Sequence, residues 1–484
     1  MDTQFIKGVA DQSRQHVVFE RLRTGILSGA LPGGARLPPS RHLAEELGVA
    51  RQTVVLAYER LAAEGYVRAR IGSGTFVATD LPDAAPEPRP AAQISGAELS
   101  RRGSMIAAVP VSSAGPVEGA SMLLAPGVPS VESFPAAAWA RCTARVLRSF
   151  DGAAYPDMQG LAALRQAVAG HLAATRGLIA DPAQIVITAG TQQALRVAAE
   201  LLLDPGDPAW VEDPGYIAGR GALSAAGARL VPVPSDAEGL DVAEGIRRAP
   251  EARLVLVSPS HATPIGGALP IGRRLALLDW AARAGTWVLE DDCDSEFRWE
   301  GKPLPPLASL DRGGRVIYCG TFSKTLAPGL RLGFAVLPQP LTAAFVRARG
   351  LGDRGPGSLQ QSVLATFINE GLLGPHIRRV RTEYARRRVA LLDALHKHCP
   401  AIIPQAAPGG LHLVIRLDDH ANEAAIVTAA RARGLAVSPF AAYFNGPACF
   451  PGLVIGFATT PVAMAGEVAR RLASAIRATE DTPR

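Results

Sequence analysis

One lysine stands in a setting that suits covalent chemistry. Lys324 lies between Ser323 and Thr325 in the stretch 320–333 (GTFSKTLAPGLRLG), where most other residues are small or apolar. The chain has only four lysines and uses arginine for its other fixed cations. Arginine keeps its proton, whereas a partly desolvated lysine can act as an amine nucleophile. We therefore interpret Lys324 as a Schiff-base amine; the alternative is a surface lysine that follows a strand.

Other chemically useful residues also follow apolar runs that are typical of buried strands. Gly190 precedes a predicted helix, Tyr216 stands on a turn, and Asp291 forms an acidic pair with Asp292. In an open α/β sheet, ligands bind outside the carboxyl ends of the strands, so we expect these groups and Lys324 to share one edge. A glycine turn into a helix N-terminus can bind an anion. Each group also has a structural alternative: a core tyrosine for Tyr216, and a metal ligand or a helix cap for the acidic pair.

Together these groups meet the requirements of one cofactor, pyridoxal 5'-phosphate. Its phosphate needs backbone N–H groups, hydroxyls and an arginine, and its ring needs a stacking partner. Its pyridine nitrogen needs a carboxylate, and its aldehyde needs a lysine. The sequence contains no GxxxxGK[ST] motif, which excludes a Walker-type nucleotide loop. We therefore predict pyridoxal phosphate as the cofactor, and we predict no metal site.

The first 78 residues have the pattern of a DNA-binding module. Two short helices, 41–47 and 51–64, flank a turn at 48–50, and a β-ribbon follows at 65–78. Two helices joined by such a turn are the helix-turn-helix signature, whose second helix reaches base edges with its N-terminal residues. The predicted DNA contacts are Arg51, Gln52 and Thr53 at base edges, and Ser40, Arg41, Arg68, Arg70 and Gly72 at the backbone or hairpin tip. The alternative is a small helical protein-interaction domain.

Composition limits the class of protein. The chain has 484 residues and a formal net charge of +6, which permits nucleic-acid binding without showing it. Five scattered cysteines form no CxxC pair, which suits a reducing cytosol and argues against disulfides and a zinc site. We find neither a signal peptide nor a run of apolar residues long enough to span a membrane, so we expect a cytoplasmic protein.

The pattern predicts three segments. Residues 1–78 form the DNA-binding domain, and residues 79–120, rich in proline and alanine without periodicity, form a linker. Residues 121–484 form an α/β domain whose small subdomain begins at about residue 345. Within it, residues 376–388 form a basic helical run, which we interpret as a solvated helix face, with contact to the DNA backbone as the alternative.

Longer motifs carry a family resemblance. Residues 31–77 contain GGARLPPSR, LGVARQT and GSGTF, and they resemble the winged helix-turn-helix of GntR-type regulators. Residues 122–475 contain ITAGTQQAL, VEDPGY, SPSH, EDDCDSEFR and GTFSKT in this order, and they look like a fold-type I aminotransferase. The whole chain resembles the MocR family of transcriptional regulators. This resemblance implies an α/β fold with a mostly parallel sheet, a smaller C-terminal α+β domain, and a homodimer.

The resemblance also implies roles for single residues. Lys324 would hold the cofactor as a Schiff base, Asp291 would pair with the ring nitrogen with Asp292 as the fallback, and Tyr216 would stack on the ring. The remaining contacts would be Gly190, Thr191, Thr321, Ser323 and Arg331 around the phosphate and His261 near the ring hydroxyl.

Two departures from the family pattern bear on function. Cys293 stands where the family usually has a tyrosine that bonds to the ring hydroxyl, and a thiol is a weak donor. Residues 441–457 contain no arginine, although aminotransferases clamp a substrate carboxylate with an arginine in this region. We therefore predict a regulator that binds a DNA operator and senses pyridoxal phosphate or an amino compound. The alternative is a working aminotransferase.

Overall fold

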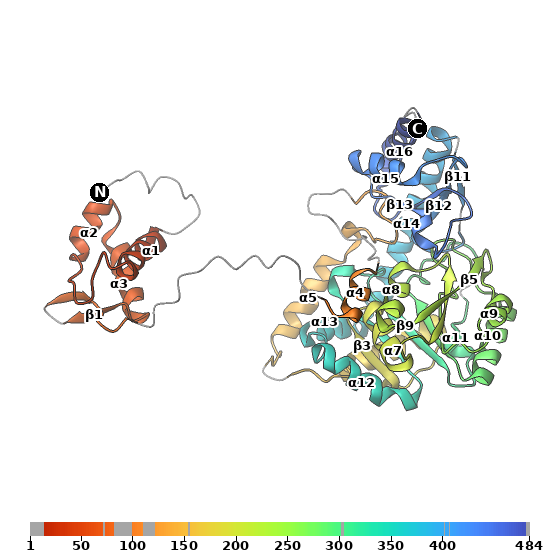
Figure 1. Cartoon of the computed structure of the whole chain (residues 1–484), viewed down its shortest axis with the longest axis horizontal. Helices are drawn as coiled ribbons and strands as arrows, with labels where there is room; N and C mark the ends of the chain where they lie inside the picture. The colour runs from red at the N-terminus through yellow and green to blue at the C-terminus, as the bar shows by residue number, and fades with distance from the viewer. Residues whose placement is uncertain are drawn as a thin grey trace. The chain divides into compact units, whose positions relative to one another are not determined.

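The computed structural model describes residues 14–70, 73–81, 99–109, 122–152, 155–301, 304–400, 402–405 and 407–480. Gly72, which we predicted to contact DNA, lies outside the described residues. The chain divides into two units, Met1–Glu98 and Leu99–Arg484 (Figure 1). We refer to the second unit as the body.

The N-terminal unit folds around a small apolar core. Its elements are α1 (Arg14–Leu27), α2 (Ser40–Leu47), α3 (Arg51–Ala63), β1 (Val67–Arg70) and β2 (Gly74–Val77). Phe19, Val54 and Leu61 are fully buried in the core where α1 packs on α3. Gly48 ends α2 in the left-handed conformation (φ 64°), which turns the chain into α3. β1 and β2 form an antiparallel ribbon, so the predicted winged helix-turn-helix is confirmed.

A short helix stands at the start of the body. It is α4 (Arg101–Ala107), and Ser100 caps it by accepting a hydrogen bond from the N–H of Gly103 at 3.0 Å. α4 packs against α8 (Ile217–Ala226). The predicted linker 79–120 therefore includes residues that belong to the fold of the body.

An eight-stranded sheet with the order β3-β10-β9-β8-β7-β4-β5-β6 forms the centre of the body. Its strands are β3 (Ile185–Thr188), β4 (Pro208–Asp213), β5 (Arg229–Asp236), β6 (Gly239–Leu240), β7 (Leu254–Val257), β8 (Trp287–Asp292), β9 (Val316–Thr321) and β10 (Gly333–Val336). β9, β8, β7, β4 and β5 pair in parallel, and β10 is antiparallel to both β9 and β3. β3 therefore also runs in the parallel direction, and the carboxyl ends of β3, β4, β8 and β9 share one edge. The prediction of a mostly parallel sheet is confirmed.

Helices cover both faces of this sheet, because successive side chains of a strand point to opposite faces. The helices of this part are α5 (Ala136–Leu147), α6 (Ala162–Arg176), α7 (Thr191–Leu202), α9 (Val242–Arg248), α10 (Ile271–Ala284), α11 (Leu307–Leu310), α12 (Gln339–Asp353) and α13 (Ser358–Asn369), together with α8. Val186 packs with α7, α8 and α12, while Ile185 and Ile187 pack with α5, α6 and α13. Within the described residues, no helix combines the length and the apolar character needed to cross a bilayer.

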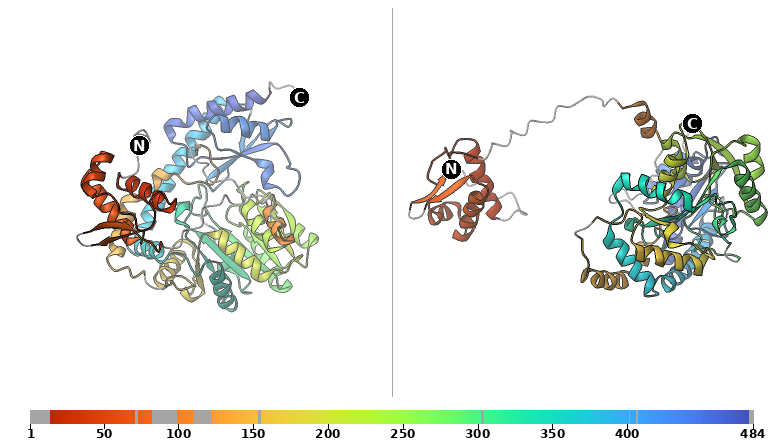
Figure 2. Two further views of the ribbon diagram at one scale, coloured as in Figure 1. Left: turned by 60° about the vertical axis from the view of Figure 1, so that its left-hand side comes forward. Right: turned by 90° about the horizontal axis from the view of Figure 1, so that it is seen from below.

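The C-terminal residues form a lobe with its own antiparallel sheet, of order β11-β12-β14-β13. The elements of this C-terminal lobe are α14 (Leu373–His398), β11 (Ile403–Gln405), β12 (His412–Arg416), α15 (Glu423–Ala432), β13 (Ser438–Pro439), β14 (Gly452–Gly456) and α16 (Ala465–Glu480). The lobe, blue in Figures 1 and 2, lies beside the eight-stranded sheet. Leu373 packs in the core of the larger sheet and Val380 in that of the lobe, so the two cores meet within α14. This point is later in the chain than the predicted start at about residue 345.

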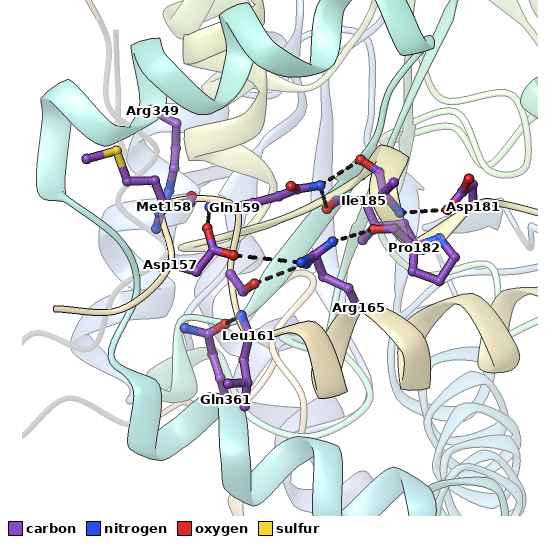
Figure 3. A network of polar contacts seen from close by, with 12 residues as sticks. Asp157, Met158, Gln159, Leu161, Arg165, Asp181, Pro182, Ile185, Arg349 and Gln361 are labelled. Atoms are coloured by element: carbon purple, nitrogen blue, oxygen red, sulfur yellow. Dashed lines mark hydrogen bonds and ion pairs between the residues drawn. The ribbon is translucent and has the colours of Figure 1, made fainter. Parts of the chain in front are cut away.

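A polar network holds the loop that precedes α6 (Figure 3). Gln159 Nε2 donates to the carbonyl oxygens of Ala183 at 2.7 Å and Ile185 at 3.1 Å. The N–H of Leu161 donates to Gln361 Oε1 at 2.7 Å. Asp157, Arg165 and Arg349 complete the network. The loop is thereby fixed to β3, α12 and α13.

Gly160 in this loop has no space for a side chain. Its φ is +97°, and a Cβ would lie 2.5 Å from the side chain of Ile187. Gly206 has the same φ of +97° but nothing within 4 Å, which makes it a matched control. We expect Gly160→Ala to destabilise the body by about 2–5 kcal/mol, because overpacking adds to backbone strain, and Gly206→Ala by about 1–2 kcal/mol from strain alone. Denaturant unfolding of both variants measures the difference, and equal losses would contradict the packing argument.

Candidate functional site

A cavity of about 230 Å³ opens at the carboxyl edge of the parallel strands. The residues predicted to bind the cofactor that line it are Thr191, Tyr216, Thr321, Ser323, Lys324 and Arg331. Gly190 adjoins the cavity through its contact with Arg331, and Asp291 interacts electrostatically with Lys324. His261 does not line the cavity.

Lys324 enters the cavity from the turn that follows β9. Its Nζ donates a hydrogen bond to the carbonyl oxygen of Gly127, in the segment that precedes α5. In the part of the chain that the structure describes, no acidic side chain forms an ion pair with this amine. The amine is therefore held by a neutral acceptor at the wall of the cavity, which suits a nucleophile better than a buried salt bridge would.

The N-terminus of α7 forms an anion-binding corner of the cavity. Gly190 precedes it with a φ of 85°, and a Cβ there would lie 3.1 Å from the Arg331 guanidinium, so glycine lets the two approach. Arg331 donates to the carbonyl oxygen of Ala189 at 2.5 Å. Thr321 Oγ1 donates to Ser323 Oγ at 2.9 Å and accepts from the Ser323 N–H at 3.1 Å. Free N–H groups, two hydroxyls and a guanidinium together make a site for a phosphate.

The two neighbouring acids of β8 have different surroundings. Asp292 forms an ion pair with Arg176 at 2.7 Å and accepts a hydrogen bond from the Tyr318 hydroxyl at 2.6 Å. Asp291 is buried and forms no hydrogen bond or ion pair among the described residues, whereas Asp292 is paired through Oδ2 and only its Oδ1 lacks a partner. Burial, with the charges of Asp292 and Asp294, raises the pKa of Asp291 to about 7, although Lys324 opposes the shift. Of the two acids, Asp291 is therefore the one that needs a proton donor from a ligand.

The C-terminal lobe closes the cavity on another side. Tyr216 ends the turn after β4 and lines the cavity with Tyr443 and Ser438 from the lobe. The carbonyl oxygen of Tyr443 accepts hydrogen bonds from the Gly215 N–H at 2.9 Å and from Arg220 Nη1 at 2.8 Å. These bonds join the lobe to the start of α8, so a ligand in the cavity contacts both the sheet edge and the lobe.

His261 stands behind the cavity wall. Its Nδ1 lies 3.3 Å from Oδ2 of Asp294, and a Cβ on Gly410 would lie 2.1 Å from the imidazole ring, so the ring is tightly enclosed. Asp294 itself lines the cavity, as does Cys293. Burial raises the pKa of the Cys293 thiol well above its ordinary value, so this thiol is neutral. His261 thus acts on the cavity through Asp294, and its predicted place near the ring hydroxyl remains a prediction.

Sequence reasoning gave no role to several residues that line the cavity. They are Asp294, Thr263, His412, Ser438 and Tyr443. Asp294 lay within the quoted EDDCDSEFR motif and could have been singled out as a third acid. The residues of the C-terminal lobe follow no motif that points to a ligand. No group of three His, Cys, Asp or Glu side chains in the described ranges is arranged to hold a metal ion.

The N-terminal unit presents the predicted DNA contacts on its surface. Arg51 and Gln52 are exposed at the start of α3, with Thr53 half-buried beside them. Arg51 Nε donates to Ser40 Oγ at 3.5 Å, which places the start of α2 next to the start of α3. Arg41, Arg68 and Arg70 are also exposed. Arg68 forms an ion pair with Asp80 at 2.5 Å, which offsets part of its charge.

The buried acid Asp291 makes a prediction about pH. Asp291 keeps its proton up to about pH 7 in the folded protein, whereas its ordinary pKa is 3.8. Between pH 5 and 7 the folded state therefore binds more protons than the unfolded state, and stability falls as pH rises. Asp291→Asn removes the ionisable group. We therefore expect the free energy of unfolding of this variant to fall between pH 5 and 7 by about 1–3 kcal/mol less than that of the wild type. Unfolding without added ligand at pH 5, 6 and 7 measures this, and parallel profiles would contradict it.

Comparison with known proteins places the two units in known families. Residues 14–77 match the family described as bacterial regulatory proteins, gntR family, and residues 121–472 match aminotransferase class I and II. The chain is 38% identical over 452 residues to the probable rhizopine catabolism regulatory protein MocR of Rhizobium meliloti, covering 93% of this chain and 91% of that protein. It is 34% identical to the HTH-type pyridoxine biosynthesis transcriptional regulator PdxR of Corynebacterium glutamicum, covering 90% of each.

Solved structures show the same fold in the body. The alpha-aminoadipate aminotransferase LysN of Thermus thermophilus, complexed with N-(5'-phosphopyridoxyl)-L-leucine, superposes with a TM-score of 0.71 at 29% identity, over 78% of this chain and 97% of that chain. The kynurenine aminotransferase of Pyrococcus horikoshii, in complex with PMP, has a TM-score of 0.69 at 28% identity, over 75% of this chain and 92% of that chain. Because full-length relatives that share both units are transcriptional regulators, this chain belongs to the MocR family of DNA-binding transcriptional regulators, which join a GntR-type winged helix to an aminotransferase-like domain.

Proposed function

We propose that the body binds pyridoxal 5'-phosphate at Lys324 and that occupation of this site changes DNA binding by the N-terminal unit. One juxtaposition carries the proposal. A lysine bonded to a neutral acceptor and an anion-binding helix N-terminus line one cavity. Asp291, a buried acid without a hydrogen-bond donor, does not line the cavity but interacts electrostatically with this lysine. Each of the three alone has a structural explanation, but together they match the three reactive ends of one cofactor.

The residues present fit this cofactor group by group. Asp291 Oδ1 would accept the proton of the ring nitrogen, which gives a buried acceptor the partner it lacks. Tyr216 would cover the ring, and Lys324 would bond to the aldehyde carbon. The phosphate would be held by Gly190, Thr191, Thr321, Ser323 and Arg331. When bound, the cofactor supplies an aldehyde that reacts reversibly with primary amines.

We also propose how the N-terminal unit contacts an operator. Arg51, Gln52 and Thr53 would face base edges, because the N-terminal end of a recognition helix reaches into the major groove. Ser40, Arg41 and the ribbon residues Arg68 and Arg70 would contact phosphates, which position the unit without reading sequence. Arg68 would have to exchange its ion pair with Asp80 for a phosphate, so its net contribution should be the smallest of the three arginines.

A homodimer is part of the proposal, and one surface of the body supports it. Tyr155 and Leu351 are 79% and 91% exposed, and Met158 is 44% exposed. Met158 lies against Gly350, next to Leu351, on the loop that the polar network holds in place (Figure 3). Large exposed apolar side chains on a rigid support are typical of an interface. Sedimentation equilibrium at micromolar concentration should give the mass of two chains, and the mass of one chain would contradict the dimer.

The proposed change in DNA binding requires that the ligand contact two arrangements of the body differently, and so bind them with different affinities. A ligand in the cavity contacts the sheet edge and the C-terminal lobe, so it should favour one arrangement of the two. We propose that this change is passed to the DNA-binding unit. Pyridoxal phosphate, or an amino compound that binds with it, would then be the signal that the regulator reads.

Replacing the lysine tests the cofactor site. We expect purified wild-type protein titrated with pyridoxal phosphate to develop a visible absorbance band, and Lys324→Ala to show none, because the amine is missing. Lys397→Ala removes an exposed lysine at the end of α14 and should behave like the wild type. DNA affinity should change at least about threefold with the cofactor in wild type, a shift of roughly 0.7 kcal/mol, and not in Lys324→Ala. A band in Lys324→Ala would reject the site, and equal DNA affinities in wild type would reject the switch.

Two substitutions in the N-terminal unit should separate sequence reading from backbone contact. Gln52→Ala should lower the preference for a selected operator over random DNA by about 1–3 kcal/mol, since a side chain at a base edge reads sequence. Arg41→Ala should weaken binding to both DNAs alike and reduce the salt slope by about 1. Both side chains are exposed, so neither change should unfold the unit. Fluorescence anisotropy at several salt concentrations measures this, and a uniform loss in Gln52→Ala would contradict its role.

A working aminotransferase is the competing function. The cavity is lined by the lysine and the anion site that such an enzyme needs, and the acid Asp291 interacts electrostatically with the lysine. Sustained conversion of an amino acid and a keto acid by the purified protein would support this alternative, and a single stoichiometric turnover would not.

A further inference from the structure

We propose that the effector read by this cavity is an amine without a carboxylate, whose tail carries hydrogen-bond donors such as a hydroxyl or a second amino group. The inference rests on the proposed function, since it concerns the same cavity. The inference follows from the charges of the residues that line the cavity. Asp294 is a carboxylate that can bind a ligand ammonium, and the described lining residues include no cation that is free to bind a ligand carboxylate.

The cationic side chains of the cavity are already engaged. Arg331 is bonded to Ala189 at the anion-binding corner, and Lys324 is bonded to Gly127. The remaining basic residue in the wall is His412. Its Nε2 lies 2.9 Å from the carbonyl oxygen of Pro264, which only accepts, so Nε2 carries a hydrogen. Burial lowers the pKa of His412 to about 4, so the ring is neutral. Among the described residues of this chain that line the cavity, none is therefore left to neutralise a ligand carboxylate.

The C-terminal lobe contributes hydroxyl groups and the neutral imidazole of His412 to the wall. Val454 on β14 does not line the cavity; it is fully buried, pairs with Ser438 of β13, and packs with Tyr443. Ser438 and Tyr443 line the cavity. Hydroxyls can accept or donate, so they suit a polar uncharged tail. They do not offset the cost of burying a carboxylate, which needs a paired cation.

Asp294 supplies a fixed negative charge to the same wall. It lines the cavity, is 6% exposed, and has its Oδ2 3.3 Å from His261. Burial alone would raise its pKa, but His261, at 3.3 Å, and Lys324 outweigh burial and hold the pKa below its ordinary value. The carboxylate is therefore ionised at neutral pH. It attracts an ammonium or hydroxyl donor and repels a carboxylate in a cavity of about 230 Å³.

Three ligands of one chain length test the proposal: 4-aminobutanol, 1,4-diaminobutane and 4-aminobutyrate. Full-length protein loaded with pyridoxal phosphate is titrated with each by calorimetry, and DNA affinity is measured in parallel. We expect the alcohol and the diamine to bind at least about tenfold tighter than the acid, a difference of about 1.4 kcal/mol. We also expect the two to change DNA affinity, while the acid at the same concentration does not.

Asp294→Asn keeps the shape of the side chain and removes its charge. The substitution should weaken the binding of 1,4-diaminobutane by about tenfold or more. The difference in affinity between this diamine and 4-aminobutyrate should therefore become smaller. Asp419 is an exposed acid of the C-terminal lobe that does not line the cavity, so Asp419→Asn is the control and should leave all three affinities unchanged. If Asp294→Asn does not load the cofactor, the ranking of the three ligands on the wild type still decides the question.

The outcomes separate this inference from the function on which it rests. Absence of the visible band in the wild type with pyridoxal phosphate would overturn both. A normal band with 4-aminobutyrate bound as tightly as the amines, or with none of the three bound, would overturn the effector class and leave the cofactor site intact. Unchanged ligand preference in a loaded Asp294→Asn variant would overturn the role of this carboxylate.

Discussion

The proposed site depends on one buried acid, Asp291, whose carboxyl group has no hydrogen-bond donor among the described residues. Asp291 sits at the end of β8, and Arg176, which reaches this strand end, is paired with Asp292 and not with Asp291. Burying an ionised acid without a partner is costly, so the pKa of Asp291 rises and the protein gains from a ligand that offers a proton. Lys324 and the α7 N-terminus stand where such a ligand would be held at its two other ends.

The position of the cavity between two lobes gives this site a means of signalling. Hydrogen bonds from Gly215 and Arg220 to the carbonyl oxygen of Tyr443 join the lobe to the sheet edge. These bonds lie beside the cavity, whose lining residues come from both the sheet edge and the lobe. A ligand can shift an equilibrium only by its different affinity for two arrangements, and a ligand that spans both lobes has such a difference. An enzyme site and a sensor site can therefore share one geometry.

The departures from the aminotransferase pattern lie on the ligand side of the cavity. The lysine, the acid and the anion-binding corner are all present, whereas residues 441–457 contain no arginine and Cys293 is a weak donor. The part that would hold a cofactor thus matches the fold, and the part that would hold an amino-acid substrate does not. This division is consistent with the general rule that one fold can carry different functions through changes at its site.

The sequence by itself determined the helix-turn-helix unit and the mostly parallel sheet of the body, and it predicted that Lys324 follows the carboxyl end of a strand. Each of these follows from local patterns: apolar runs, glycine turns, and the rule that ligands bind at the carboxyl ends of parallel strands. Only the tertiary structure decided which of Asp291 and Asp292 lacks a partner, because that depends on Arg176, far away in sequence. It also decided that His261 lies behind Asp294 and that Ser438 and Tyr443 complete the wall. These contacts join segments that no short-range pattern relates, since they arise when the C-terminal lobe packs onto the sheet edge.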